Sequence, residues 1–101
     1  MGGYGWGDTQ EQDFIDAIHE AVDHGVNFFD TANTYGLGQS EETLAKGLGD
    51  RRKDVVIQSK FGVRVMKDMV GTKTIYDNSP DYIRKALEGT LQRLHTDYID
   101  I

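Results

Sequence analysis

Three side chains of different chemistry stand where strand-like runs give way to polar sequence: Asp30, Tyr35 and Lys60. The apolar run 26–29 ends in Asp30, Tyr35 follows five positions later, and the apolar run 55–57 leads to Lys60. If the two runs are neighbouring parallel strands, an acid and an ammonium meet at one edge of a sheet, beside a phenol. These groups are the parts of a proton-transfer site.

A plainer interpretation fits the same charges. A charged group at the end of a buried strand costs free energy unless it is paired, so Asp30 and Lys60 are also what a purely structural ion pair would require. From the residues alone, this structural pair is the more common case. The spacing therefore leaves a catalytic and a structural role open.

Three helices are expected to position these groups. Apolar residues recur at helical spacing in each, and each begins with a residue suited to capping and ends near a glycine or a polar turn. Thr9 with Gln12 forms a capping box, Ser40 precedes two acids, and Ser79 precedes a proline. The sequence predicts helices over about 9–24, 40–48 and 79–94.

Strands are predicted near 26–30, 55–60 and 98–101, the second fully buried. The basic turn 50–54 is expected to be surface decoration, and 61–79 is expected to be a long loop without clear periodicity, of a length that usually serves function. Helices alternating with strands indicate a parallel α/β sheet. A doubly wound sheet and a (β/α)₈ barrel both fit this alternation.

Composition narrows the class of protein. The chain has 101 residues, enough for about one small domain, with a net charge of −6 and no cysteine. An acidic chain does not favour a nucleic-acid or anionic-membrane partner, and without thiols there is neither a disulfide framework nor a thiolate metal site. No run is long and apolar enough to span a membrane. We therefore expect a soluble cytoplasmic protein.

Other candidate groups are weaker. His19, His24 and His95 have no neighbours at metal-ligand spacing, so they are interpreted as surface residues and no metal is expected. The glycine-rich stretch 1–7, which carries Trp6, lacks the spacing of a dinucleotide fingerprint. It fits either a frayed terminus or a loop that approaches a ligand closely.

Several motifs together resemble one known family. Phe29-Asp30-Thr31-Ala32 with Tyr35-Gly36 is similar to a motif of the aldo-keto reductases. The match continues in order and spacing through Gly38-Gln39-Ser40-Glu41, Ser59-Lys60-Phe61-Gly62, Ser79-Pro80, Leu91-Gln92-Arg93-Leu94 and Asp97-Tyr98-Ile99-Asp100. It covers nearly the whole chain, and several motifs in register are more specific than any one of them.

The resemblance implies a (β/α)₈ TIM barrel that reduces aldehydes or ketones with NADPH. Asp30, Tyr35 and Lys60 match the family's aspartate, tyrosine and lysine and form the candidate catalytic set; Asp30 and Trp6 are the candidate cofactor-binding residues. The family's histidine lies beyond the strand that begins at Tyr98. A whole barrel needs about 250 residues, so 1–101 is expected to be a single incomplete domain, the first part of such a barrel.

In the implied reaction, hydride reaches a carbonyl carbon and the carbonyl oxygen takes a proton. Tyr35 is the expected donor, because an ammonium at Lys60 would stabilise the phenolate that remains, and Asp30 would hold Lys60 charged and in place. The expected partner is a small carbonyl substrate. The substrate itself, and NADP against NAD, stay open.

An alternative of another class is a non-catalytic partial barrel, truncated or designed, that self-associates. An open parallel sheet leaves strand edges and one apolar face uncovered, and both recruit other chains. A second copy of the chain would supply the opposite wall.

Overall fold

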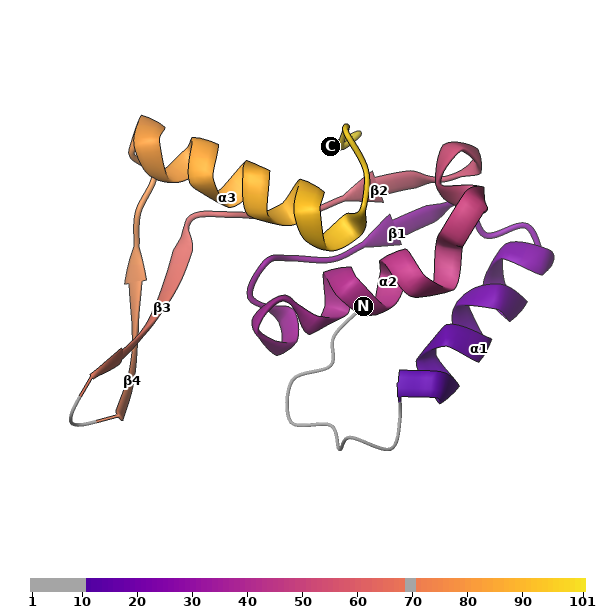
Figure 1. Cartoon of the computed structure of the whole chain (residues 1–101), viewed down its shortest axis with the longest axis horizontal. Coiled ribbons are helices and arrows are strands. Elements are labelled where there is room, and N and C mark those ends of the chain that lie inside the picture. Colours follow the sequence, from indigo (N-terminus) through magenta and orange to yellow (C-terminus); the bar gives the residue numbers. More distant parts are fainter. Residues whose placement is uncertain (1–10, 69–70) are drawn as a thin grey trace.

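The computed structural model describes residues 11–68 and 71–101 (Figure 1). Trp6 and the predicted cap Thr9 lie outside these residues. The elements, in chain order, are helix α1 (Glu11–Asp23), strand β1 (Phe28–Asp30), helix α2 (Gln39–Leu48), strand β2 (Val56–Gln58), strands β3 (Val63–Asp68) and β4 (Gly71–Tyr76), and helix α3 (Pro80–Leu94). Short 3-10 turns, Tyr35–Gly38 and Gly49–Asp54, precede and follow α2.

Strands β1 and β2 pair in parallel, as predicted. Phe28 lies opposite Val56, Phe29 opposite Ile57, and Asp30 opposite Gln58. Because side chains alternate along a strand, Phe29 and Ile57 share one face of the pair. Both are buried on that face.

The predicted third strand, 98–101, runs beside β2. Ile101 N–H donates to the Ile57 carbonyl over 3.2 Å, and Ser59 N–H donates to the Ile101 carbonyl over 3.1 Å. These two bonds are the pattern of a parallel pair around Gln58 and Ile101. The segment therefore extends the sheet in the order β1, β2, 98–101, although it forms too few bonds for a regular ladder.

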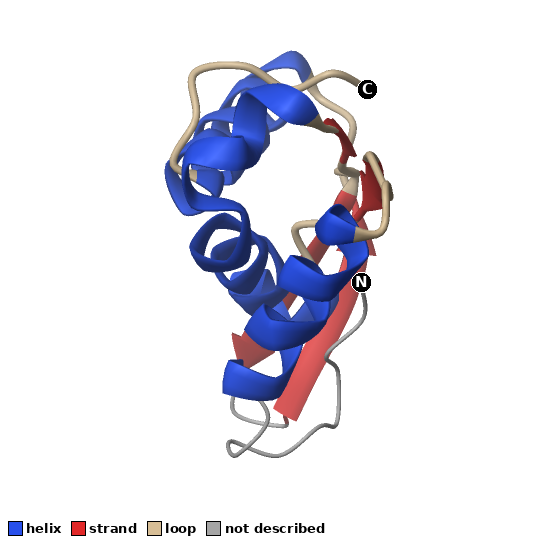
Figure 2. Cartoon of the chain, turned by 90° about the vertical axis from the view of Figure 1, so that its right-hand side faces the viewer, coloured by secondary structure: helices blue, strands red, loops and turns tan. Residues whose placement is uncertain are grey.

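The helices cover one face of this sheet. Ile18 of α1, Leu44 of α2 and Leu94 of α3 join Phe29 and Ile57 in a single buried core. Figure 2 shows the helices gathered to one side of the strands. A doubly wound sheet carries helices on both faces, whereas a barrel carries them only outside. The arrangement is that of the N-terminal part of a barrel wall.

The other face of the sheet is open. Val26 and Phe28 are 43% and 48% exposed, and Val56 is only partly covered. The prediction that β2 is fully buried is therefore wrong, since burial alternates along the strand with Val55 and Ile57 covered. In a closed barrel this face points to the interior.

The segment 61–79 is not a structureless loop, which corrects the prediction. Strands β3 and β4 form an antiparallel hairpin, with Val63 opposite Tyr76 and Asp68 opposite Gly71. Figure 1 shows the hairpin projecting from the rest of the molecule, at the far end of α3 from the C-terminus. The sequence carried the signal, because β-branched residues alternate with other residues along both strands.

Helix α2 begins one residue earlier than predicted. Ser40 is not its cap: the helix starts at Gln39 and follows Gly38, whose φ is 98°. A positive φ suits glycine and lets the chain turn directly from the preceding 3-10 turn into the helix. Ser40 consequently lies within the first turn, and its side chain shares a hydrogen bond with Thr31 instead of capping the helix.

Helix α3 follows its predicted boundaries. The Ser79 side chain accepts a hydrogen bond from Tyr82 N–H over 3.3 Å, and Pro80 is the first helical residue. The helix ends at Leu94 because His95 takes a left-handed conformation, with φ of 52°. His95 is exposed, as are His19 and His24, so the prediction that the histidines are surface residues is confirmed.

One basic residue of the turn 50–54 is structural rather than surface decoration. The Arg52 side chain is 12% exposed and donates to Asp100 Oδ2 over 3.0 Å, while its guanidinium lies 4.0 Å from the ring centre of Tyr98. Asp100 Oδ2 also accepts from Ile57 N–H over 2.9 Å. That backbone donor, followed by Arg52, lowers the Asp100 pKa. The contacts of Arg52 with Tyr98 and Asp100 therefore hold the segment 98–101 against β2.

Candidate active site

The parallel register brings Asp30 and Lys60 together. Asp30 ends β1 opposite Gln58, and Lys60 follows two residues after Gln58. Lys60 Nζ donates to Asp30 Oδ1 over 2.7 Å and to the Thr31 carbonyl over 2.8 Å. The ammonium is thus held at the carboxyl edge of both strands, where catalytic groups of parallel barrels lie.

Gln58 is part of the same cluster, and sequence reasoning missed it. Its Nε2 donates to Asp30 Oδ1 over 2.9 Å, so one carboxylate oxygen accepts from both Gln58 and Lys60. The hydrogen bond from Lys60 is the largest effect and lowers the Asp30 pKa; burial opposes it, and the weaker Gln58 bond adds to the lowering. The signal available was the register, since Gln58 is the residue directly across from Asp30.

Lys60 stays protonated throughout the neutral range. Burial is the largest single effect and lowers its pKa, but the hydrogen bond and negative charge of Asp30, with smaller contributions from Tyr35, outweigh burial, so the Lys60 pKa is raised. The Lys60 and Asp30 side chains are 43% and 45% exposed. The pair is therefore a fixed cation at an accessible edge rather than a buried bridge.

Tyr35 lies next to this cation. Lys60 Nζ is 5.1 Å from the centre of the Tyr35 ring, a cation–π contact. The loop carrying the tyrosine is tied to β2 by Asn33 N–H, which donates to the Lys60 carbonyl over 3.3 Å. After Tyr35 the backbone turns sharply, with positive φ at Gly36 and Leu37. The structure thus brings all three members of the predicted set together.

Two buried side chains of α2 lie behind the site, and sequence reasoning gave them no role there. Ser40 Oγ and Thr31 Oγ1 share a hydrogen bond of 2.8 Å. Glu41 accepts from Ser59 Oγ over 2.8 Å and from Arg93 Nε over 2.7 Å. Thr31 directly follows Asp30, and Ser59 directly precedes Lys60. These contacts therefore hold the chain next to both members of the ion pair.

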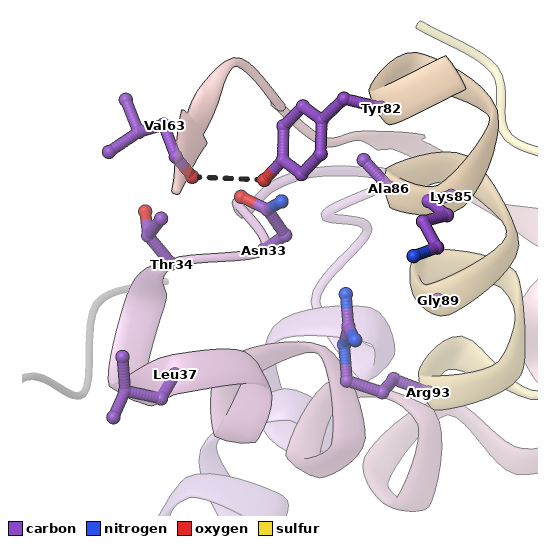
Figure 3. A pocket seen from close by; sticks show the side chains of 9 residues that line it. All are labelled: Asn33, Thr34, Leu37, Val63, Tyr82, Lys85, Ala86, Gly89 and Arg93. Atoms are coloured by element: carbon purple, nitrogen blue, oxygen red, sulfur yellow. Dashed lines mark hydrogen bonds between the residues drawn. The ribbon is translucent and has the colours of Figure 1, made fainter. Parts of the chain in front are cut away.

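A cavity of about 400 Å³ lies on the α3 side of the Tyr35 loop (Figure 3). It is lined by Asn33, Thr34, Leu37, Val63, Tyr82, Lys85, Ala86, Gly89 and Arg93. In Figure 3 the Lys85 and Arg93 side chains point into it from α3, and the Tyr82 hydroxyl donates to the Val63 carbonyl over 3.2 Å. The cavity therefore presents cations and amide or hydroxyl groups beside an apolar wall, next to the loop that carries Tyr35.

Residues 11–68 and 71–101 contain neither a cluster of metal ligands nor a membrane-spanning helix. Within them, no group of histidine and carboxylate side chains is arranged to hold a metal ion. None of the helices there has both the length and the apolar character that a membrane crossing requires. The predictions of a cytoplasmic location and of no nucleic-acid partner stay predictions.

Comparison with protein families gives one match over the whole chain. Residues 1–101 match the model described as "Aldo/keto reductase family". Among curated proteins, the NADH-specific methylglyoxal reductase of Escherichia coli is 40% identical over 108 residues, covering 99% of this chain and 33% of that protein. The chain spans about a third, or less, of the length of the curated relatives it matches.

Solved structures agree with this match. A glycerol dehydrogenase from Gluconobacter oxydans superposes with a TM-score of 0.84 at 34% identity, covering 96% of this chain and 30% of that one. An aldo-keto reductase from Klebsiella pneumoniae, solved in complex with NADPH, superposes with a TM-score of 0.75 at 26% identity, covering 99% of this chain and 32% of that one. The fold and the order of its elements are therefore shared with complete enzymes.

Proposed function

The chain belongs to the aldo/keto reductase family, and on that premise we propose that it carries the proton-transfer site of an NADPH-dependent oxidoreductase that reduces aldehydes or ketones to alcohols. The observation that carries the proposal is the cluster of Asp30, Lys60 and Tyr35. Lys60 Nζ lies 2.7 Å from Asp30 Oδ1 and 5.1 Å from the Tyr35 ring centre. In this proposal, residues 1–101 form a single incomplete barrel domain.

Each member of the cluster has a distinct role in the proton transfer. Tyr35 donates its phenolic proton to the carbonyl oxygen as negative charge develops there. The Lys60 ammonium stabilises the resulting phenolate, because an opposite charge nearby favours the ionised form. Asp30 keeps Lys60 protonated and in place, and Gln58 orients the carboxylate. In the reverse direction, the phenolate accepts a proton from an alcohol.

The residues present fit a nicotinamide cofactor. They form an accessible edge with a proton donor and a fixed cation, and protein side chains do not themselves supply hydride. When bound, NADPH supplies the hydride that adds to the carbonyl carbon. Asp30 and Trp6 are the residues proposed to contact it. The relatives differ in nucleotide: the methylglyoxal reductase is NADH-specific by name, while the Klebsiella structure holds NADPH, so both should be assayed.

Carbonyl-dependent oxidation of NADPH by the protein and its Tyr35→Phe variant tests the proposal. General acid catalysis contributes on the order of 100- to 10,000-fold, so we expect a loss of kcat in that range. Tyr76→Phe is the matched control, because Tyr76 is 86% exposed on β4 and should leave turnover unchanged. Turnover retained by Tyr35→Phe would exclude the phenol as the proton donor.

One observation favours a second candidate function, a non-catalytic partial barrel that associates with copies of itself. Val26 and Phe28 expose apolar surface on the open face of the sheet. Association would bury this face and supply the missing wall. Sedimentation of the chain tests this candidate, and a strictly monomeric, cooperatively folded chain would argue against it.

A further inference from the structure

Glu41 is a fully buried carboxylate, with 0% of its surface exposed. Its Oε1 accepts a hydrogen bond from Arg93 Nε over 2.7 Å, across 52 residues of sequence. A buried carboxylate is costly unless it is paired and its oxygens are satisfied, and removal of one partner is strongly destabilising. The pairing explains how α2 tolerates the charge, but it does not by itself explain why a charge is there.

The second oxygen of Glu41 reaches the site. Oε2 accepts from Ser59 Oγ over 2.8 Å, and Ser59 directly precedes Lys60. The Ser59 N–H is also bonded, to the Ile101 carbonyl at 3.1 Å. Ser59, the residue before Lys60, is therefore held on both sides: by Glu41 of α2 and by Ile101 of the segment 98–101.

The residue before Glu41 does the same for the other strand. Ser40 Oγ bonds to Thr31 Oγ1 over 2.8 Å, and both side chains are buried. Thr31 directly follows Asp30, its N–H donates to the Gln58 carbonyl over 2.8 Å, and its own carbonyl accepts from Lys60 Nζ over 2.8 Å. Consecutive residues of one helical turn thus hold the chain beside each member of the Asp30–Lys60 pair.

Gly38 permits this arrangement. Its φ of 98° is in the region where side chains are strained, and a Cβ there would lie 2.7 Å from Arg93 Cδ and 3.0 Å from Arg93 Nε. A side chain at position 38 would displace Arg93, which donates to Glu41 and also lines the cavity shown in Figure 3. Gly38, Ser40 and Glu41 of this motif therefore all contribute to the contacts behind the Asp30–Lys60 pair.

From this geometry we propose that Glu41 and Ser40 are positioning residues of the reaction, which set the separation of Asp30 and Lys60 through Ser59 and Thr31. The role rests on the proposed function of the same site. Groups that act on a reacting atom must be held to within about half an ångström, and supporting hydrogen bonds supply that precision. A purely structural role would make the same contacts but leave the Asp30–Lys60 geometry unchanged when one link is cut.

Ser59→Ala separates the two roles. It removes the link to the site and leaves the Glu41–Arg93 pair in place, so the fold keeps its buried ion pair. The readout is the carboxyl titration of Asp30, followed by ¹³C NMR. Lys60, which has the largest lowering effect on the Asp30 pKa, and the neutral amide of Gln58 both donate to its carboxylate, and the amino terminus adds a weaker positive charge. We expect the Asp30 pKa to rise toward its ordinary value in Ser59→Ala and to be restored in Ser59→Thr, which keeps the hydroxyl.

Ser79→Ala is the matched control. It also deletes a serine hydroxyl, which accepts one hydrogen bond from Tyr82 N–H at the start of α3. It should lower thermal stability without moving the Asp30 titration. If Ser59→Ala loses stability as Ser79→Ala does and the Asp30 titration does not move, the positioning role is overturned.

A kinetic measurement adds to the titration. Where the protein turns over, Ser59→Ala should lower kcat by about tenfold with little change in KM, because it disturbs the proton-transfer geometry rather than substrate binding. The NMR readout needs no turnover. A failure of the proposed function would show as Tyr35→Phe having no effect, whereas a failure of this inference would show as an unchanged Asp30 titration.

Discussion

At the residue scale, the site is defined by a single carboxylate oxygen. Asp30 Oδ1 accepts from Lys60 over 2.7 Å and from Gln58 over 2.9 Å, so two donors meet at the same oxygen. The Lys60 hydrogen bond is the largest cause of the lowered Asp30 pKa. Burial lowers the Lys60 pKa, but the contributions of Asp30 and Tyr35 outweigh burial and raise it. The pair is consequently charged across the whole neutral range.

Replacement of the cation should show in the acid. In Lys60→Met, we expect the Asp30 pKa to rise toward its ordinary value, since the largest contribution to its lowering is the Lys60 hydrogen bond. A lowered pKa contributes stability above the ordinary value, and that stability is lost as pH falls through the lowered value. The difference in stability between the two proteins should therefore shrink in acid. ¹³C titration and thermal unfolding between pH 2 and about pH 7 measure both effects.

Lys46→Met is the control for this prediction. Lys46 also forms a 2.7 Å ion pair, with Glu11, but on the outer surface between α1 and α2. It should leave Asp30 unchanged. An Asp30 titration that is the same in Lys60→Met and the original protein would mean that the pair is not formed in solution.

At the element scale, the close approach of α1 and α2 depends on Gly47. A Cβ built on Gly47 would lie 2.7 Å from Ile18 Cδ1 and 2.9 Å from Ile18 Cβ and Cγ2. Ile18 is the buried residue of α1, and it belongs to the core that includes Phe29 of β1. The glycine therefore sets how near α1 lies to α2, and through Ile18 how α1 packs on the strand that ends in Asp30.

We expect Gly47→Ala to destabilise the protein by about 1–3 kcal/mol, as overpacking does in a close-packed core. Gly89→Ala provides the contrast. Gly89 is also within a helix, but its added Cβ would meet only the end of the flexible Arg93 side chain, at 3.0 Å. Because alanine favours helix by up to about 1 kcal/mol over glycine, that variant should be neutral or slightly more stable. Urea unfolding of both variants measures the change in their free energy of unfolding. Equal changes would contradict the packing argument.

At the scale of the whole molecule, the sheet is covered on one face and open on the other. Core residues from α1, α2 and α3 pack against Phe29 and Ile57, while Phe28 on the opposite face is 48% exposed. The relatives that share this fold are about three times as long, and a barrel interior is filled by side chains from all its strands. The open face is where such side chains would pack.

If the chain associates through this face, a charge placed there should prevent it. We expect Phe28→Glu to shift sedimentation toward the monomer, because the carboxylate would be buried without a partner in the associated form. Leu37→Glu is the matched control, since Leu37 is 59% exposed in the turn after Tyr35 and not on the sheet. Association that persists in Phe28→Glu would place the contact elsewhere.

Local sequence signals predicted much of the fold. The Ser79-Pro80 start of α3, the parallel strands and the strand-end charges all follow from short-range patterns, and the structure confirms them. The errors have local causes as well. Gly38 accepts a positive φ, so α2 starts at Gln39 rather than after Ser40. The segment 61–79 lacks clear periodicity as a whole, which predicts a loop, whereas 63–68 and 71–76 pair as a hairpin.

The sequence by itself identified the candidate residues for the chemistry: an acid, a phenol and a lysine at the ends of strands, within motifs that resemble a known family. Only the tertiary structure decided what holds them. Glu41 bonds to Ser59 and Arg93, which are 18 and 52 residues away, and nothing in the local sequence distinguishes it from the exposed Glu42 beside it. Backbone preference acts over a few neighbouring residues, whereas burial and pairing of a charge depend on which distant segments pack around it.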